Sequence, residues 1–217
     1  MTTSNQDRTL NQGRMLEAVR VGRLVPILRL RDHGRAVEVA ETLVAAGVRA
    51  LELTLGLASA PGAIEAVVGV VGDRVSVGAG TVLSADDVRR VAAAGAEFCV
   101  SPHFDPAVVE AALPAGLVPI PGTFTASEIV AARAAGAPLV KLFPAGPVGP
   151  GYLKALLGPF PDLAVIPTGG IGIDDVPRWL EAGAVAVGLG SDLVPASGAL
   201  DGLADRARRA VALAVPS

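Results

Sequence analysis

Short apolar segments alternate with amphipathic segments along almost the whole chain. Each apolar segment is bounded by glycine, proline or charged residues, a pattern that is typical of buried parallel strands. Eight segments of this kind are expected to be strands: Leu24–Leu30, Ala50–Leu55, Val75–Gly80, Glu97–Ser101, Leu117–Pro121, Leu139–Phe143, Ala164–Thr168 and Ala184–Leu189.

Alanine-rich segments between these strands predict helices. The expected helices cover residues 34–46, 60–70, 84–94, 105–112, 125–135, 149–157 and 173–181, with a leading helix near 11–21 and a last helix near 199–214. The expected N-cap residues are Ser84, Asp105, Thr125 and Asp174. Thr125 is followed three residues later by Glu128, which is the spacing of a capping box. An Ala-Gly pair ends several of these helices, and glycine there supplies the left-handed conformation that stops a helix.

The regular alternation of strand and helix predicts an α/β protein, a (β/α)8 TIM barrel with an N-terminal helix. A doubly wound open sheet is the alternative, because 217 residues suit either architecture. No linker interrupts the alternation, so residues 13–217 are expected to form a single domain after a flexible tail at residues 1–12.

Two expected strands carry ionisable side chains among apolar residues. In residues 51–55 the leucines alternate with Glu52 and Thr54, which places these two polar residues on the opposite face, towards the barrel interior. In residues 139–143, Lys141 and Phe143 share one face. A buried charge is costly unless it is paired or functional, and active sites of such barrels lie at the carboxyl ends of the strands. We therefore expect Glu52 and Lys141 to be functional; a structural ion pair between them is the alternative.

Lysine usage supports a chemical role for Lys141. Of the 18 lysines and arginines in the chain, only Lys141 and Lys154 are lysines. A neutral amine can attack a ketone, whereas a guanidinium essentially never loses its proton. Lys154 falls on an expected helix and is interpreted as a solvated surface residue.

Glycine-rich segments follow the last two expected strands. They contain Thr168, Gly169 and Gly170 in one case and Gly190 and Ser191 in the other. Loops at these positions of a barrel commonly bind phosphate through backbone N–H groups, although simple tight turns would have a similar sequence. Arg29 ends the first expected strand and is a candidate to hold a carboxylate or phosphate; an exposed arginine without a role is the alternative.

Composition excludes several other classes of protein. The formal net charge is −3 and no basic patch stands out, so nucleic acid is not expected as a partner. No apolar run is long enough to span a membrane, and residues 1–14 lack the apolar core of a signal peptide. The lone Cys99 cannot form an internal disulfide and is expected to be a buried strand residue, which suits a cytoplasmic protein.

Seven segments together resemble the class I 2-keto-3-deoxy-6-phosphogluconate (KDPG) and 4-hydroxy-2-oxoglutarate (KHG) aldolase family, which includes enzymes for the galactonate epimer. The resemblance extends from about residue 20 to 195, in order and at matching spacing. The segments are Pro26–Arg29, Leu51–Leu55, Val77–Leu83, Val100–Pro102, Pro121–Thr123, Lys141–Ala145 and Pro167–Ile171.

The resemblance implies roles for individual residues. Lys141 matches the Schiff-base lysine, and Glu52 matches the carboxylate that moves protons through a bound water. Thr81 and Pro102 match the pocket for the pyruvate part, and Phe143 matches the aromatic lining beside the lysine. Gly169, Gly170 and Ser191 match the residues that bind the substrate phosphate. The family also implies a homotrimer with no metal and no cofactor.

The chain departs from the gluconate-type pattern at two positions. Gly56 stands where an arginine would hold the keto-acid carboxylate, and Arg29 is the expected substitute. Gly146 stands where an acidic residue is expected. We expect an aldolase that cleaves the phosphorylated gluconate-type keto acid to pyruvate and glyceraldehyde 3-phosphate. The galactonate and 4-hydroxy-2-oxoglutarate substrates remain alternatives, as do a phosphate-binding barrel isomerase or epimerase and a non-catalytic binder of phosphometabolites.

Overall fold

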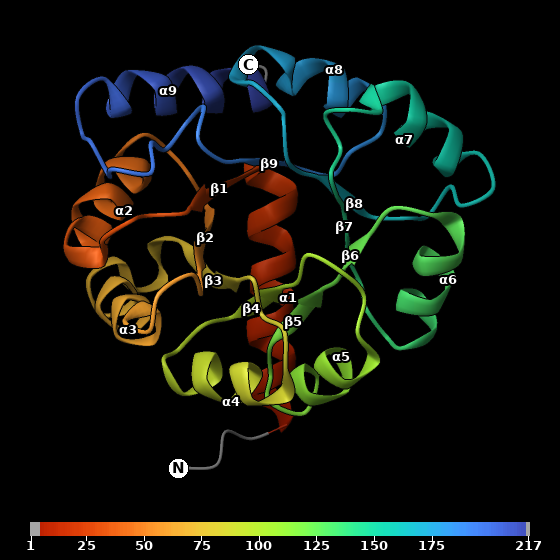
Figure 1. Ribbon diagram of the computed structural model, residues 1–217, viewed down its shortest axis with the longest axis horizontal. Coiled ribbons are helices and arrows are strands. Elements are labelled where there is room, and N and C mark those ends of the chain that lie inside the picture. Colours follow the sequence, from red (N-terminus) through yellow and green to blue (C-terminus); the bar gives the residue numbers. More distant parts are fainter. Residues whose placement is uncertain (1–4, 216–217) are drawn as a thin grey trace.

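Parallel strands form the centre of the molecule and helices surround them (Figure 1). The computed structural model describes residues 5–215. Within these residues the strands are β1 Leu24–Leu28, β2 Ala50–Thr54, β3 Ser76–Gly80, β4 Phe98–Val100, β5 Val118–Ile120, β6 Gly122–Thr123, β7 Val140–Leu142, β8 Val165–Pro167 and β9 Val187–Leu189. All eight expected strand segments therefore contain a strand. The fifth segment, expected at residues 117–121, is longer than predicted: it continues to Thr123 and is divided by Pro121 into β5 and β6.

The strands form two parallel sheets that meet at two places. One sheet has the order β5-β4-β3-β2-β1-β9 and the other has the order β6-β7-β8. The Lys141 N–H donates to the carbonyl of Pro121 at 2.9 Å, and a parallel bridge joins Thr168 to Gly188. Strands adjacent in the sequence are adjacent in space, without the reversal of order that a doubly wound sheet has. The predicted α/β class is confirmed as a curled sheet of parallel strands.

The helices lie outside this sheet, except for α1. They are α1 Asn5–Gly22, α2 Ala36–Ala45, α3 Ala60–Val71, α4 Ala85–Ala93, α5 Pro106–Ala112, α6 Ala126–Ala134, α7 Gly149–Leu157, α8 Val176–Glu181 and α9 Leu203–Ala214, with 3-10 turns η1 His33–Arg35, η2 Gly72–Arg74 and η3 Ile173–Asp175. Helix α1 begins at Asn5, earlier than expected, so it includes residues 5–12 of the predicted tail; residues 1–4 lie outside the described residues. No helix within residues 5–215 combines the length and the apolar sequence that crossing a bilayer requires.

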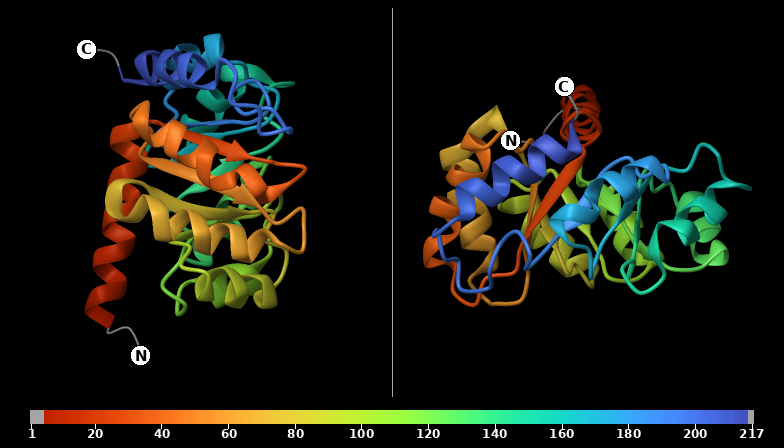
Figure 2. Two further views of the ribbon diagram at one scale, coloured as in Figure 1. Left: turned by 90° about the vertical axis from the view of Figure 1, so that its left-hand side faces the viewer. Right: turned by 90° about the horizontal axis from the view of Figure 1, so that it is seen from above.

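Two apolar clusters fill the molecule. The larger cluster lies between the strands and the outer helices and contains Leu51 and Leu53. The smaller cluster fills the interior of the curled sheet, where Met15 and Val19 of α1 pack with Phe98 and with apolar residues of other strands. Helix α1 therefore covers that end of the strands, and Figure 2 shows it as a red helix across one edge of the molecule. The opposite end remains available for a site.

The local capping rules were correct at three of the four expected positions. Ser84, Asp105 and Thr125 each accept a backbone hydrogen bond in the first turn, and Thr125 and Glu128 form the capping box. The prediction for Asp174 was wrong: this residue lies within η3 and pairs with Arg209 of α9 instead. Its short-range sequence gave no sign of a partner 35 residues away.

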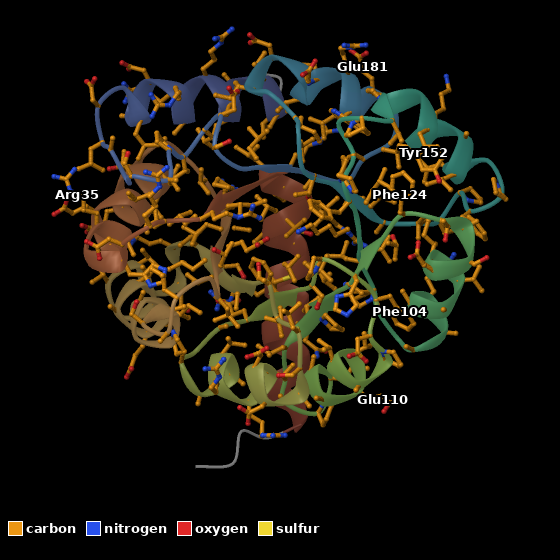
Figure 3. The ribbon with its side chains drawn as sticks, viewed as in Figure 1. Arg35, Phe104, Glu110, Phe124, Tyr152 and Glu181 are labelled. Atoms are coloured by element: carbon orange, nitrogen blue, oxygen red, sulfur yellow. The ribbon has the colours of Figure 1, made fainter. Side chains whose placement is uncertain are left out.

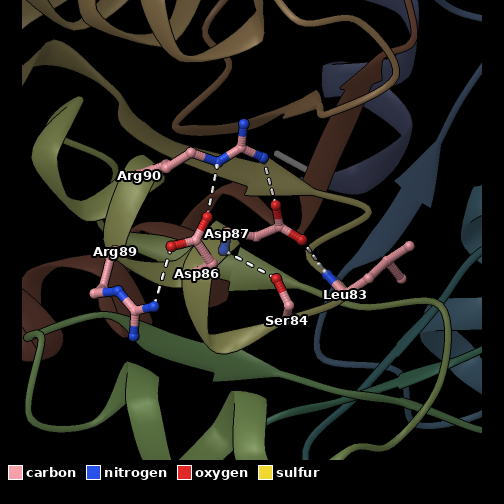
Figure 4. A network of polar contacts seen from close by, with 6 residues as sticks. All are labelled: Leu83, Ser84, Asp86, Asp87, Arg89 and Arg90. Atoms are coloured by element: carbon pink, nitrogen blue, oxygen red, sulfur yellow. Dashed lines mark hydrogen bonds and ion pairs between the residues drawn. The ribbon is translucent and has the colours of Figure 1, made fainter.

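The first turn of α4 shows how such a cap is completed (Figure 4). The Ser84 hydroxyl accepts from the N–H of Asp87 at 3.1 Å, and the Asp87 carboxylate accepts from the N–H of Leu83 at 3.0 Å. Arg90 pairs with Asp87 from the next turn. Partial burial works against ionisation, but the bonds from Arg90, Leu83 and Ser84 lower the pKa of Asp87 below its usual range.

We expect Ser84→Ala to reduce the free energy of unfolding by about 1 kcal/mol, because the N–H of Asp87 loses its acceptor. Thermal unfolding would show a melting temperature lower by roughly 2–4 °C. Ser127→Ala is the matched control, since Ser127 is exposed in the first turn of α6 and makes no side-chain hydrogen bond within the described residues. Equal melting temperatures for the two variants would contradict the role of the cap.

Candidate active site

Lys141 and Glu52 lie on the inner face of the curled sheet, as expected. Glu52 is in the middle of β2 and is 3% exposed, and Lys141 is in the middle of β7 and is 6% exposed. Both side chains line one small interior cavity, together with Ile27 of β1 and Thr168, which follows β8. The alternation along each strand therefore brings together two ionisable groups that are 89 positions apart in the chain.

Burial and charge act in opposite directions on Glu52. Burial raises the pKa of this carboxyl above its ordinary value of 4.5, while the positive charges of Lys141 and Arg29 partly offset that increase. Within the described residues, no carboxylate lies within 4.0 Å of the Lys141 amine. The amine instead lies 4.8 Å from the centre of the Phe143 ring, within the range of a cation–π contact. The lysine is thus close to the glutamate without being locked in an ion pair.

Gly80 provides the space that the Glu52 carboxylate occupies. A Cβ atom added at Gly80 would lie 1.7 Å from Oε1 of Glu52, far inside any contact distance. Gly188 has the same relation to Thr168, whose Oγ1 would be 2.3 Å from an added Cβ. Glycines on β3 and β9 therefore make room for polar side chains on the neighbouring strands.

Thr81, which follows β3, adopts an unusual backbone conformation. Its φ of 61° lies in the left-handed region, which is unfavourable for a β-branched residue. Hydrogen bonds fix both backbone groups of the next residue, Val82. Its N–H donates to the carbonyl of Val100 at 3.1 Å, and its carbonyl accepts from the Ser101 hydroxyl at 2.7 Å. Strain of this kind is concentrated at functional sites and persists where the surroundings enforce it.

Thr54 and Pro102 also lie at the carboxyl ends of strands. Thr54 is the last residue of β2, is buried, and is paired in register with Gly80. Pro102 follows β4, and an added Cβ at Gly122 would lie 2.3 Å from its carbonyl carbon. Neither residue lines the cavity around Lys141 or the larger cavity described next. Their predicted contact with substrate stays a prediction.

A cavity of about 400 Å³ opens beside the Lys141–Glu52 cavity. It shares Ile27 and Thr168 with that cavity, so the two adjoin. Most of the predicted substrate-binding residues line it: Arg29, Phe143, Thr168, Gly169, Gly170, Gly190 and Ser191. The structure therefore brings the expected phosphate loops to one side of the expected catalytic pair.

The two glycine-rich loops present backbone N–H groups in this cavity. Within the described residues, no acceptor is hydrogen-bonded to the N–H groups of Gly170, Gly190 or Ser191. Such groups are available for an anion. Gly146 approaches one of these loops closely, because its added Cβ would lie 2.3 Å from the carbonyl oxygen of Gly170. That close approach explains why the acidic side chain expected at position 146 does not fit this chain.

Two residues of the site were missed from sequence. The Thr123 hydroxyl, buried in β6, donates to the carbonyl of Lys141 at 3.2 Å and so fixes the backbone that carries the amine. The Asp192 carboxylate accepts from the N–H of Ile173 at 2.7 Å and joins the loop after β9 to the loop after β8. Both residues act across elements, and no local pattern marks them.

Comparison with known proteins agrees with this geometry. A family model described as KDPG and KHG aldolase matches residues 15–206. This chain belongs to that family. Among the relatives, 2-dehydro-3-deoxy-6-phosphogalactonate aldolase of Escherichia coli K12 is 35% identical over 185 residues, covering 85% of this chain and 90% of the relative. The 2-dehydro-3-deoxy-phosphogluconate aldolase of Pseudoalteromonas atlantica is 37% identical over 196 residues, covering 88% and 91%.

A solved structure described as native KDPGal has a TM-score of 0.84 and 34% identity, covering 88% of this chain and 93% of that one. The aldolase assignment, and with it the aldehyde-lyase class expected from sequence, is confirmed. The relatives carry both gluconate and galactonate names, so family membership leaves the sugar epimer open.

Among the described residues, no three His, Cys, Asp or Glu side chains form a group that could hold a metal ion. Independence from metal stays a prediction.

We expect Gly80→Ala to lower kcat of this aldolase at least tenfold and to cost about 1–3 kcal/mol of stability, because the added methyl displaces the Glu52 carboxylate. Gly69→Ala is the control: Gly69 is in α3 and an added Cβ meets nothing within 4 Å. This control should be neutral or slightly stabilising. Steady-state kinetics and thermal unfolding measure both effects, and wild-type activity in Gly80→Ala would contradict the assigned position of Glu52.

Proposed function

We propose that this protein is a class I aldolase that cleaves a phosphorylated 2-keto-3-deoxy sugar acid to pyruvate and glyceraldehyde 3-phosphate through a Schiff base on Lys141. The observation that carries the proposal is the burial of one lysine and one glutamate in a single interior cavity that adjoins a glycine-lined cavity. The lysine–glutamate pair suits carbonyl chemistry, and the glycine-lined cavity suits a phosphate.

In this proposal the substrate phosphate binds to the N–H groups of Gly170, Gly190 and Ser191, which points the keto group towards Lys141. The lysine, as the free amine, attacks C2 of the keto acid, and loss of water gives a protonated imine. Phe143, whose ring lies beside the amine, would limit the positions that the imine can take. Arg29 would hold the keto-acid carboxylate in place of the arginine missing at Gly56.

Glu52 would then move the protons. Its carboxylate accepts the proton of the C4 hydroxyl through a water molecule, the C3–C4 bond breaks, and the bonding electrons pass into the imine to give an enamine. Glyceraldehyde 3-phosphate leaves. The enamine takes a proton at C3, and water hydrolyses the resulting imine to release pyruvate. Burial next to two cations suits a carboxyl that must both accept and return a proton.

The Pro167–Gly170 segment, which resembles the gluconate-type enzymes, supports the gluconate-type substrate as the first choice. The galactonate epimer is the second candidate, supported by the galactonate-type relative and by the segments Gly149–Leu156 and Gly188–Leu193, which resemble the galactonate-type enzymes. Pyruvate release from both epimers and from 4-hydroxy-2-oxoglutarate, measured side by side, decides among them. The proposal also includes a closed (β/α)8 barrel, in which β5 and β6 act as one strand, a homotrimer and a cytoplasmic location.

We expect borohydride in the presence of pyruvate to inactivate the enzyme and to add the mass of pyruvate, less water and plus two hydrogens, to Lys141. Reduction of the imine makes the bond between enzyme and substrate permanent. Peptide mass spectrometry locates the adduct. Lys141→Met should take no adduct, while Lys154→Met should be labelled like the wild type. An adduct on Lys154, or none at all, would contradict the Schiff-base proposal.

We expect kcat/KM to decline as the pH falls through the raised pKa of Glu52, because the ionised carboxylate is the form that accepts the substrate proton. Since burial raises that pKa, the acid limb of the profile should lie above pH 4.5. Glu52→Gln should lose this limb and reduce kcat by about 10²–10⁴-fold.

Glu97→Gln is the matched control for this profile. Burial raises the pKa of Glu97 as well, but this residue bonds Ser76 and Arg14 near the amino-terminal ends of the strands. The control should keep the wild-type acid limb. An acid limb that survives in Glu52→Gln would show that another group accepts the proton.

A further inference from the structure

Arg206 lies in the first turn of α9 and joins two parts of the loop that connects β9 to this helix. Its Nε donates to the carbonyl of Leu193 at 3.1 Å, and its Nη1 donates to the carbonyl of Asp201 at 3.2 Å. The two carbonyls are near the beginning and the end of the loop. One guanidinium therefore restrains the loop at both of these points.

The carbonyl of Leu193 belongs to the turn that carries Ser191. The N–H groups of Leu193 and Val194 both donate to the carbonyl of Gly190, at 3.0 and 2.9 Å. Leu193 is fully buried, and Arg206 itself does not line the cavity. Arg206 thus holds the turn without occupying the space in which an anion would bind.

The same helix also restrains the other glycine-rich loop. Arg209, three residues after Arg206 and so on a similar face of α9, pairs with Asp174 in η3. The neighbouring Ile173 N–H donates to Asp192, which lies in the turn that Arg206 holds. Helices α8 and α9 lie next to each other, at the top of the view in Figure 3. The two loops and α9 therefore form one connected polar assembly.

The positive charge of Arg206 is not neutralised by contact. Within the described residues, no carboxylate lies within 4.0 Å of its guanidinium nitrogens. Its Nη2 is buried and has no hydrogen-bond partner there. A guanidinium stays protonated, and Arg206 is half-buried, so solvent screens its charge only in part. This cation therefore adds positive potential beside a turn whose Gly190 and Ser191 line the cavity.

We propose that Arg206 is a positioning residue for the phosphate of the substrate. It holds the Gly190–Val194 turn in its anion-binding shape and contributes positive potential there, without touching the substrate. This inference rests on the proposed function. It predicts that loss of Arg206 weakens the recognition of phosphorylated substrates and leaves the chemistry at Lys141 intact.

The test compares Arg206→Met with Arg208→Met in two assays. The first assay measures KM and kcat for the phosphorylated keto acid. The second measures the rate of borohydride trapping with pyruvate, which carries no phosphate. Arg208 is the matched control because it is exposed on the same helix and pairs only with Asp205 within the described residues. Both variants lose one positive charge.

We expect Arg206→Met to raise KM for the phosphorylated substrate about tenfold, equivalent to the loss of one charge-assisted interaction. Its kcat and its rate of pyruvate trapping should stay within about twofold of wild type. Arg208→Met should match the wild type in both assays. Arg206→Lys, which restores the charge and one donor, should recover part of the loss.

Several results would overturn the proposal. One is an unchanged KM in Arg206→Met. The others are a fall in the rate of pyruvate trapping as large as the rise in KM, or an equal rise in KM in Arg208→Met. If Arg206→Met does not fold, Arg206→Lys must still show a KM raised severalfold, and a wild-type KM in that variant also overturns it. Failure of the proposed function has a different signature, because the wild type itself would then not be trapped by pyruvate and borohydride.

Discussion

The site depends on keeping two ionisable groups, a carboxyl and an amine, buried on the inner face of the curled sheet. Glu52 and Lys141 are each less than a tenth exposed, and neither forms a direct ion pair with any residue of 5–215. Removing such groups from water is expensive, and their mutual attraction compensates for only part of the cost. The raised pKa of Glu52 reports the same balance, since burial outweighs two neighbouring cations. A carboxyl that burial makes easier to protonate suits the proton transfers proposed for Glu52.

The interior of the curled sheet changes character along its length. Near the amino-terminal ends of the strands it is apolar, where Met15, Val19 and Phe98 pack together. Near the carboxyl ends it is polar, and glycines replace bulky residues next to Glu52 and Thr168. Helix α1 covers the apolar end, which leaves the polar end as the side where the two cavities lie. The same strands thus provide an apolar base at one end and a cavity lined by polar residues at the other.

The residues that could be predicted from sequence are those marked by a local pattern. Strict alternation identified the faces of Glu52 and Lys141, because side chains along a strand alternate between the two faces. The caps at Ser84 and Thr125 also follow from spacing within one turn. Asp174 has the same local signature, and yet it pairs with Arg209 in a distant helix. Local rules identify donors and acceptors but do not choose among distant partners.

Contacts between elements account for what the sequence could not reveal. The bond from Thr123 to the carbonyl of Lys141 depends on the pairing of β6 with β7. From the sequence, Gly146 is only a departure from the family pattern. Its close contact with Gly170 explains why this chain has a glycine at that position. Arg206 is the clearest case, because one of many arginines in the chain becomes distinctive only when its two carbonyl partners are identified.

The two glycine-rich loops after β8 and β9 need support of this kind because of their composition. Gly169 and Gly170 adopt left-handed conformations, and glycine has more conformational freedom to lose than any other residue. A loop that must be ordered on binding weakens affinity by the entropy of ordering, whereas a loop held in advance does not. Binding energy from a remote phosphate accelerates cleavage only if it fixes the keto group against the lysine. Rigid attachment of both loops to α9 would therefore serve the chemistry at Lys141 as well as substrate affinity.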